Sequence, residues 1–433
     1  MAWSPDSNLL ASASDDNIIR LWDRDGQCIK QLKGHKSLVY FLEWAPDGSV
    51  LASVEPGSEA GGKESAVIGF WYRNGKLITW QRVSRIRALA WSIDGKFLAS
   101  GSSDKMIRLW DKKGKLVRVL KGHSGSVHSL AFSPTTGLLA SSSANGEIFF
   151  WDKEFNYTKA HHGGTQRDIL KLRWSPDGKL LTSFGDRKIF FWSEDGERIR
   201  DLIDVVALSV AHTEDIIDLL WTSDGKLLAS VSWDRTIRLW DRNGRCFRLL
   251  KIFDSRSESQ LLLVPRSISW HSEGTILAST FNDGILRFWD KEGEYIGTGR
   301  LNLLRKTSLP VISKHSFITH DMVDYEDKVL WSPDGKILAI WERNCSSIVL
   351  LEWIISSSEK IITKTREDAQ LEEILIPENE SFCPICRQNI SSNDSIIICH
   401  FCGSFFHIKC ILKWVLKEKH IICPHCNNLF IRK

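Results

Sequence analysis

Eight residues near the C-terminal end of the chain have the side chains and the spacing of zinc ligands. They form four pairs with two residues between the members of each pair: Cys383 and Cys386, Cys399 and Cys402, His407 and Cys410, and Cys423 and Cys426. This tight spacing lets both members of a pair reach one metal ion, and Zn²⁺ takes four sulfur or nitrogen ligands in a tetrahedron. Eight ligands therefore predict two closed structural zinc sites. The metal supplies the folding free energy that so short a segment cannot obtain from a hydrophobic core.

The alternative use of these cysteines is in disulfides, and the rest of the sequence argues against it. Seven of the ten cysteines lie in this segment. The N-terminus has no basic stretch followed by an apolar one, so we expect no signal peptide and a cytoplasmic protein, whose thiols stay reduced. No apolar run approaches the roughly 20 residues of a membrane helix, so we expect no membrane span. A net charge of +4 without Lys/Arg blocks predicts no nucleic-acid partner.

The chain before this segment consists of repeats. The phrase Trp-Ser-Pro-Asp-Gly-Lys-Leu-Leu recurs with variations, and its leading aromatic residues are Trp3, Trp44, Trp91, Phe132, Trp174, Trp221, Trp270 and Trp331. A second phrase, Ile-Arg-Leu-Trp-Asp or a relative of it, follows most of these and alternates sides as a strand does. Ser-Pro-Asp-Gly is turn chemistry, because Pro sets φ, Asp bonds its own backbone and Gly accepts positive φ. Four short strands in about 40–45 residues predict one blade of a β-propeller.

From residue 1 to about residue 365 these units resemble WD repeats, which implies an all-β fold with a seven- or eight-bladed WD40 β-propeller. The resemblance also implies a buried hydrogen-bonded set of a histidine, a turn aspartate and a strand tryptophan, and His212, Asp234 and Trp240 fit it best. Asn145 replaces the aspartate in the fourth unit and a long loop replaces it in the second, so both sets are expected to be incomplete. The first unit begins at its first turn, and its innermost strand is expected to be absent. We favour eight blades with a damaged first blade, and seven blades are the alternative.

Residues 366–380 read as a polar linker, and residues 381–433 resemble RING-type fingers, which are small α+β modules. In that family the ligand pairs interleave, so the first and third pairs bind one ion (Cys383, Cys386, His407 and Cys410) and the others bind the second (Cys399, Cys402, Cys423 and Cys426). The family recruits a ubiquitin-conjugating enzyme on an apolar surface, which corresponds here to Ile385, Trp414 and Pro424. Active members often carry Arg or Lys after the last ligand, where this chain has Asn427.

Three functions are compatible with these features. The first is a ubiquitin-ligase-like protein, in which the propeller binds a substrate protein and the finger positions ubiquitin on its conjugating enzyme. The second is a non-enzymatic scaffold subunit of a trafficking or signalling complex, in which the finger only docks a partner. The third is a PHD-like reader of chromatin peptides, which has the same ligand order but normally carries an aromatic residue where this chain has Ile421.

Two further motifs invite a chemical interpretation. Residues 57–64 read Gly-x4-Gly-Lys-Glu, which departs from a phosphate-binding loop at its last residue, and they lie between two predicted strands with no helix to follow. His161 and His162 are adjacent, but we expect them in a solvated loop rather than at a metal. The insertion over residues 299–324 is expected to be a surface loop.

Overall fold

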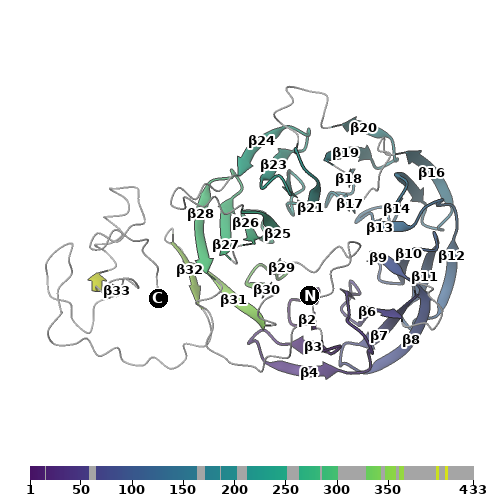
Figure 1. The fold of residues 1–433 in the computed structure, drawn as a ribbon, viewed down its shortest axis with the longest axis horizontal. Coiled ribbons are helices and arrows are strands. Elements are labelled where there is room, and N and C mark those ends of the chain that lie inside the picture. The colour runs from purple at the N-terminus through teal and green to yellow at the C-terminus, as the bar shows by residue number, and fades with distance from the viewer. Residues whose placement is uncertain are drawn as a thin grey trace. The chain divides into compact units, whose positions relative to one another are not determined.

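The structure is a computed structural model that describes residues 1–14, 16–57, 65–162, 171–185, 187–201, 212–250, 263–282, 285–300, 328–342, 347–356, 360–364, 396–398 and 405–407. The chain divides into two compact units, Met1–Glu367 and Asp368–Lys433. The first unit is a propeller of eight four-stranded antiparallel sheets, and each sheet is built from four consecutive strands (Figure 1). Within the described residues, no helix is long and apolar enough to cross a membrane.

The first four blades run from Ala2 to His162. Blade 1 consists of β1 (Ala2–Trp3), β2 (Leu10–Ala13), β3 (Ile19–Trp22) and β4 (Cys28–Leu32), and blade 2 of β5 (Phe41–Trp44), β6 (Val50–Gly57), β7 (Ser65–Tyr72) and β8 (Leu77–Ser84). Blade 3 consists of β9 (Ile86–Trp91), β10 (Phe97–Ser102), β11 (Ile107–Asp111) and β12 (Leu116–Leu120), and blade 4 of β13 (Val127–Phe132), β14 (Leu139–Ser143), β15 (Glu147–Trp151) and β16 (Tyr157–His162).

The other four blades run from Lys171 to Lys364. Blade 5 consists of β17 (Lys171–Trp174), β18 (Leu180–Gly185), β19 (Lys188–Ser193) and β20 (Arg198–Asp201), and blade 6 of β21 (Ile216–Trp221), β22 (Leu227–Ser232), β23 (Ile237–Asp241) and β24 (Cys246–Leu250). Blade 7 consists of β25 (Pro265–Trp270), β26 (Ile276–Phe281), β27 (Ile285–Asp290) and β28 (Tyr295–Arg300), and blade 8 of β29 (Lys328–Trp331), β30 (Ile337–Glu342), β31 (Ser347–Ser356) and β32 (Lys360–Lys364).

The Ser-Pro-Asp-Gly phrase and its variants form the tight turn between the first two strands of a blade. In blade 3, the Ser92 hydroxyl donates to Asp94 Oδ1 at 2.7 Å, and the amide of Phe97 donates to Ser92 Oγ at 3.0 Å. Gly95 has a φ of 65°, a left-handed conformation that glycine adopts without steric cost. The turn chemistry read from the sequence therefore sets the register in which Leu98 lies opposite Trp91.

The hydrophobic core lies between neighbouring blades. In β11, buried Ile107 and Leu109 flank half-buried Arg108, whereas β14 and β15 are buried at every residue. The buried side chains of one blade meet those of the next, so that Phe70 of blade 2 packs in one cluster with Trp110 of blade 3. Stability therefore depends on each blade having a neighbour on both sides.

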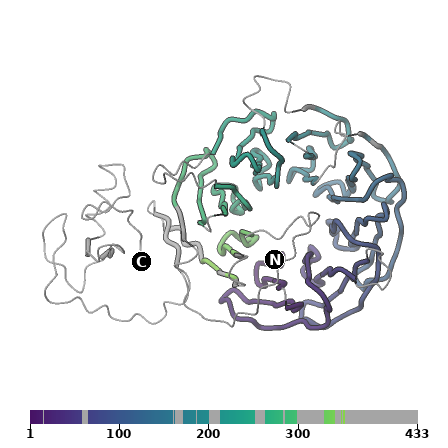
Figure 2. The backbone as a smooth tube through the Cα atoms, in the orientation of Figure 1, coloured from purple at the N-terminus to yellow at the C-terminus, as the bar shows by residue number. Residues whose placement is uncertain are grey.

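Blades 1 and 8 close the ring through side chains. Among the described strands none is shared between these two blades. Trp3 Nε1 donates to the Leu330 carbonyl at 3.2 Å, the amide of Asp334 donates to Ser7 Oγ at 2.9 Å, and Arg24 forms an ion pair with Asp334 at 2.6 Å. Figure 2 shows the purple start of the chain beside the green eighth blade. The eight blades that we favoured are confirmed. The expected loss of the innermost strand of blade 1 is wrong, because Ala2 and Trp3 pair with β2 as a two-residue strand.

Candidate functional site

The described part of the finger is one antiparallel hairpin, β33 (Ile396–Ile398) and β34 (Phe405–His407). Ile398 lies opposite Phe405, and His407 lies opposite Ile396, at the end of the hairpin away from its turn. A strand rises about 3.3 Å per residue, so the backbone of His407 is about 7 Å from that of Phe405 along the strand. Cys399 follows Ile398 directly in the sequence. The hairpin therefore keeps the backbone of His407 away from Ile398, the residue that precedes Cys399 of the second cysteine pair.

The remaining predicted finger residues lie outside the described residues. These are the ligands Cys383, Cys386, Cys399, Cys402, Cys410, Cys423 and Cys426 and the partner-binding residues Ile385, Trp414, Pro424 and Asn427. Of His407 the structure describes the backbone. In the parts of the chain that the structure describes, no group of three or more His, Cys, Asp or Glu residues could hold a metal ion.

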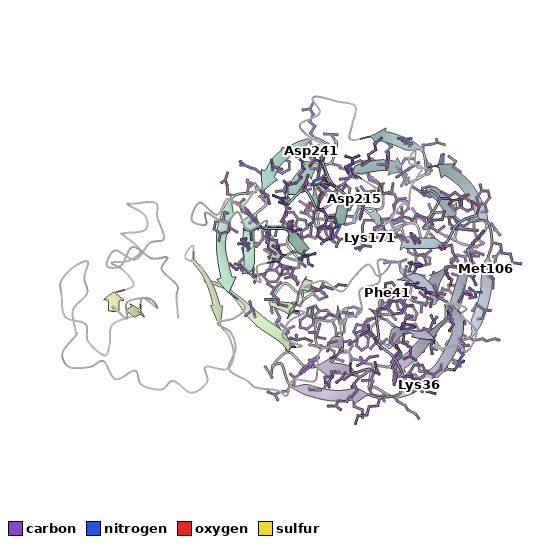
Figure 3. The ribbon with its side chains drawn as sticks, viewed as in Figure 1. Lys36, Phe41, Met106, Lys171, Asp215 and Asp241 are labelled. Carbon is purple, nitrogen blue, oxygen red and sulfur yellow. The ribbon has the colours of Figure 1, made fainter. Side chains whose placement is uncertain are left out.

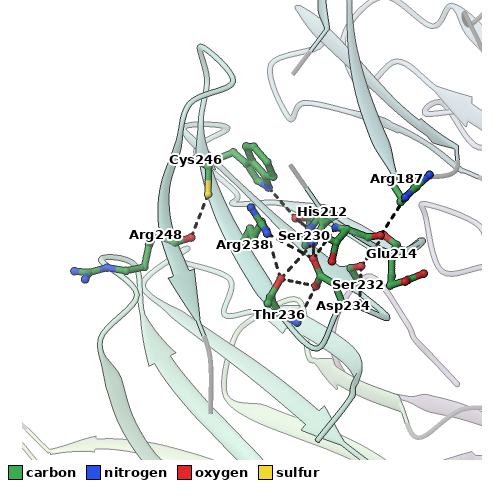
Figure 4. A network of polar contacts seen from close by, with 12 residues as sticks. Arg187, His212, Glu214, Ser230, Ser232, Asp234, Thr236, Arg238, Cys246 and Arg248 are labelled. Atoms are coloured by element: carbon green, nitrogen blue, oxygen red, sulfur yellow. Dashed lines mark hydrogen bonds and ion pairs between the residues drawn. The ribbon is translucent and has the colours of Figure 1, made fainter. Parts of the chain in front are cut away.

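In the propeller, blade 6 brings His212, Asp234 and Trp240 into one network through a fourth residue. Figure 4 shows the part of this network around His212 and Asp234. His212 Nδ1 lies 2.8 Å from Asp234 Oδ2, and His212 Nε2 lies 2.7 Å from Ser230 Oγ. Trp240 Nε1 donates to the same Ser230 Oγ at 2.8 Å. Histidine and tryptophan are therefore joined by Ser230, which the sequence analysis did not include.

The protonation of this network follows from its donors and acceptors. Burial lowers the pKa of His212, although the hydrogen bond and the negative charge of Asp234 oppose that shift. A neutral imidazole has one donor and one acceptor nitrogen. Asp234 is ionised, because its hydrogen bonds lower its pKa, and a carboxylate can only accept. The Nδ1–H of His212 therefore donates to Asp234, and Nε2 accepts from the Ser230 hydroxyl. The serine oxygen then accepts from Trp240, so each buried polar atom along this chain of bonds has a partner.

The same serine occurs in seven blades. In each, the third-strand tryptophan donates through Nε1 to a second-strand serine at 2.7–2.9 Å, and the pairs are Trp22 and Ser12, Trp71 and Ser53, Trp110 and Ser100, Trp151 and Ser141, Trp192 and Ser183, Trp240 and Ser230, and Trp289 and Ser279. The recurring Leu-Ala-Ser segment was the sequence signal for this partner, since the serine stands ten residues before the tryptophan in five of the seven blades.

Blades 2 and 4 take their carboxylate from glutamate instead of a turn aspartate. His35 Nδ1 lies 3.3 Å from Glu55 Oε2, and His123 Nδ1 lies 3.3 Å from Glu147 Oε2. Glu147 also accepts from the amide of Ser124 at 3.0 Å. In blade 4 the expectation of an incomplete set is wrong, because Glu147, a longer side chain on a strand, takes the place of the turn aspartate. In blade 2, Glu55 lies at ion-pair distance from His35, but His35 Nδ1 has no hydrogen-bond partner, so that set remains incomplete.

A second tryptophan set links neighbouring blades. In five blades the first-strand tryptophan donates through Nε1 to a backbone carbonyl of the preceding blade. The acceptor is the residue just before the first-strand aromatic residue of that preceding blade. The pairs, at 3.0–3.3 Å, are Trp3 and Leu330, Trp44 and Ala2, Trp91 and Glu43, Trp174 and Ala131, and Trp270 and Leu220. The third-strand tryptophan of a repeat therefore forms a hydrogen bond within its blade, whereas the first-strand tryptophan forms one to the preceding blade.

The structure also shows which strands adjoin the glycine-rich segment 57–64 and contain the histidine pair 161–162. Gly57 pairs with Ser65 in the hairpin of β6 and β7, so the glycine-rich segment connects two strands and no helix follows it. His161 and His162 belong to strand β16, so placing them in a loop was wrong. The His161 ring packs 5.6 Å from the ring of Trp192, between blades 4 and 5. Residues 301–327, which include most of the predicted insertion, lie outside the described residues.

Two innermost strands carry charged side chains that form an ion pair, and one of them, Lys171, lies near the centre of the ring (Figure 3). Lys171 Nζ lies 3.3 Å from Asp218 Oδ1, and both side chains are half-buried. Burial alone would raise the pKa of Asp218, but the charges of Lys171 and Arg173 keep that pKa below its usual range. Burial raises the pKa of Glu43 to about 7, against the opposing charge of Arg173. The pKa values of these two carboxyl groups therefore depend on charged residues of other blades.

Comparison with known families assigns both units. The family model described as IFT122 first beta-propeller matches residues 60–302, which is more than half of the chain. The chain belongs to the IFT122 first beta-propeller family. Repeats described as WD domain, G-beta repeat match residues 1–23 and 26–59 of this IFT122-type propeller, and the Ring finger domain model matches residues 381–427. The RING family implies that the finger binds zinc, and the propeller supports a role in protein interaction.

Curated relatives match parts of the chain. Nuclear distribution protein PAC1 of Coccidioides posadasii is 35% identical over 147 residues, which cover 30% of this chain and 31% of that protein. Periodic tryptophan protein 2 of Arabidopsis thaliana is 33% identical over 137 residues, which cover 30% of this chain and 14% of that protein. The chain thus spans less than a third of the length of each of these relatives. The crystal structure of the C-terminal WD40 domain of Sif2 superposes with a TM-score of 0.57 and 18% identity, covering 78% of this chain and 91% of that one. At that identity the similarity supports the fold alone.

Proposed function

We propose that this chain acts as a RING-type ubiquitin ligase, in which the propeller binds a substrate protein and the finger recruits a ubiquitin-conjugating enzyme. The observation that carries this proposal is the match of the Ring finger domain to residues 381–427, together with the eight paired ligands inside it. Such a finger contributes no nucleophile, because it works by holding the thioester-linked ubiquitin in a reactive position.

Two zinc ions would hold the finger in shape. Seven thiolates and one imidazole are the donors that zinc accepts in closed tetrahedral sites. The hairpin supports the interleaved assignment, because it keeps the backbone of His407 apart from the chain that leads into Cys399. In that arrangement His407 completes the site of Cys383, Cys386 and Cys410, and the remaining four cysteines form the other site.

The proposed recruiting surface consists of Ile385, Trp414 and Pro424. Apolar side chains that include a tryptophan are typical of the residues that dominate protein–protein binding energy. Asn427 follows the last ligand and can donate hydrogen bonds without carrying charge.

The test uses the full zinc-loaded chain and measures the discharge of ubiquitin from charged conjugating enzymes onto free lysine. We expect acceleration that falls at least about tenfold in Ile385→Ala, because loss of a central interface anchor costs about 2 kcal/mol or more. Ile93→Ala is the matched control, since Ile93 is 51% exposed on the propeller and should leave the rate unchanged. No acceleration across a broad enzyme panel, from protein holding its zinc, would refute ligase activity.

The second candidate is a docking subunit without enzymatic activity, and Asn427 favours it because the cationic side chain of many active RING fingers is missing. Asn427→Arg separates the two functions. A ligase should become faster with the added charge, whereas a docking module should remain without effect on discharge.

A further inference from the structure

The fourth strands of the blades form the outer rim of the ring and carry an excess of positive charge (Figure 1). Together these eight strands contain ten Lys or Arg residues against one carboxylate, that of Asp201. The whole chain has a net charge of only +4. The rim is therefore a basic surface on a molecule whose charges otherwise nearly balance.

Blade 3 has exposed cations at both ends of its fourth strand, β12. Lys113 and Lys115 lie in the turn before the strand, and Lys121 follows its last residue. Within the described residues none of these three lysines forms an ion pair, whereas the neighbouring Lys112 pairs with Asp47. No carboxylate of the described propeller therefore neutralises the charge around β12.

Other fourth strands have carboxylate partners for their cations. Lys159 of β16 forms an ion pair with Glu197 of blade 5, and Arg248 of β24 forms one with Glu294 of blade 7 at 2.7 Å. These pairs join a fourth strand to the next blade, so their cations contribute to the stability of the ring. The three lysines around β12 make no such contact, and ring stability therefore does not explain them.

Among the described residues, the outer edge of β12 is open. One edge of the strand pairs with β11, and no described strand pairs with the other. Leu116 and Val117 are 43% and 52% exposed. The guanidinium of Arg118 is held by blade 4, since it donates to the Glu154 carbonyl and to Asn156 Oδ1. The edge therefore presents unpaired backbone groups beside exposed apolar side chains, and such an edge accepts an added strand.

Cations on an edge strand can also serve to prevent pairing with another chain. The lysines of blade 3 stand at the ends of β12 instead and leave its centre apolar, so they favour a strand of opposite charge rather than exclude every strand. They disfavour a second copy of β12, because like charges would meet at both ends. A lipid bilayer fits less well, because its hydrocarbon interior offers the unpaired N–H and C=O groups no hydrogen-bond partner.

We propose that β12 and its flanking lysines bind an acidic extended segment of a partner protein, which adds to blade 3 as a fifth strand. Carboxylates at one end of the segment would contact Lys113 and Lys115, and those at the other end Lys121. Lys115 and Lys121 are six positions apart, or about 20 Å along a strand, so the segment needs about seven residues. Uncharged β-branched residues at its centre would pack beside Leu116 and Val117. This inference concerns the rim of the propeller and does not depend on ligase activity.

Binding is measured by fluorescence anisotropy on the full zinc-loaded chain. The probe is a fluorescein-labelled peptide with two glutamates at each end and Val-Thr-Val at its centre. The reference peptide carries N-methyl groups on two consecutive central amides, so it keeps the charge but cannot complete the strand pairing. We expect the reference to bind at least about tenfold more weakly, because backbone hydrogen bonds are lost. The unmethylated probe should also slow amide exchange in β12 and leave exchange in β4 unchanged.

A charge-reversed variant keeps the result independent of folding. The triple substitution Lys113→Glu, Lys115→Glu and Lys121→Glu should weaken binding of the acidic probe at least about tenfold. The same variant should bind a probe with lysines in place of the glutamates, which the parent chain should not bind. Misfolding cannot produce this gain.

The matched control reverses the charge of three exposed lysines in turns of other blades, Lys179, Lys226 and Lys336, and should bind the acidic probe like the parent chain. The proposal is overturned if the N-methylated reference binds as tightly as the probe, or if the control variant loses as much affinity as the charge-reversed variant. It is also overturned if phosphatidylserine vesicles bind the parent chain more tightly than the probe does, a result that would assign this part of the rim to a membrane surface.

Discussion

Replacing Ser230 by alanine tests whether the serine holds blade 6 together. The Ser230 side chain accepts from Trp240 Nε1 at 2.8 Å and bonds His212 Nε2 at 2.7 Å, and both partners are buried. Alanine leaves these two polar atoms without the hydroxyl. A buried polar atom without a partner costs about 1–3 kcal/mol, so Ser230→Ala should destabilise the blade by about 2–6 kcal/mol. The lower end applies if a water molecule occupies the vacated space.

Hydrogen exchange is the appropriate assay because blades of a ring can open one at a time. A loss of about 2 kcal/mol should speed amide exchange in β23 about thirty-fold. Ser12→Ala, where the Trp22 partner is only half-buried, should cost less. Ser49→Ala removes a bond to Asp47 in an exposed turn and should change little. The reasoning is refuted if β23 keeps its protection in Ser230→Ala, or if Ser49→Ala loses as much.

Three further predictions follow from the propeller and the finger. Glu43→Gln should raise the free energy of unfolding increasingly between pH 4.5 and about 7, and by a constant amount above pH 7. The reason is that the raised pKa of Glu43 makes its ionised form unfavourable in the folded state. A difference in the free energy of unfolding that does not change with pH in urea titrations would contradict this. Trp3→Phe keeps an aromatic side chain but removes the hydrogen bond to the Leu330 carbonyl, so amide exchange in β29 and β30 should speed up by the equivalent of about 1 kcal/mol. Trp91→Phe removes the corresponding bond to Glu43 and should speed exchange in blade 2 by less. Equal effects would show that the junction of blades 1 and 8 is no weaker than the other junctions. Chemical modification of the thiols should release two zinc ions per chain from the parent protein, and fewer from the Cys383→Ala variant. Release of a single ion from the parent protein would refute the assignment of two zinc sites.

The repeat pattern predicted the propeller because its signals are local. Each Pro-Asp-Gly turn and each alternating strand is encoded within a few residues, so the blades follow from the sequence alone. The two-residue β1 was missed because Ala2 and Trp3 are too few to show alternation, and they are held by β2 and by the Leu330 carbonyl of blade 8.

The buried networks were predicted only in part. The histidine and the tryptophan stand out by type, whereas Ser230 is a small residue in a run of small residues and reveals its role only through distance. Glu55 and Glu147 take the place of the turn aspartate but stand at other positions in their repeats. Comparing the turn position from one repeat to the next therefore does not reveal them.

The ion pair between two innermost strands could not be read from the sequence. Lys171 and Asp218 are 47 positions apart and belong to the neighbouring blades 5 and 6. Their ion pair forms because the innermost strands of the two blades lie next to each other, so it depends on blade packing rather than on any local motif. The zinc ligands are the opposite case, since their identity is carried by spacing alone.

The most direct test of the proposed ligase activity compares the full chain with Trp414→Ala, both shown to hold the same zinc content, in single-turnover discharge of ubiquitin from its conjugating enzyme onto lysine. The proposed function predicts that the parent chain accelerates discharge and that Trp414→Ala loses at least about tenfold of this rate, as expected for the central anchor of an interface. Equal rates for the two proteins, or a parent rate no faster than that of the conjugating enzyme alone, would contradict it.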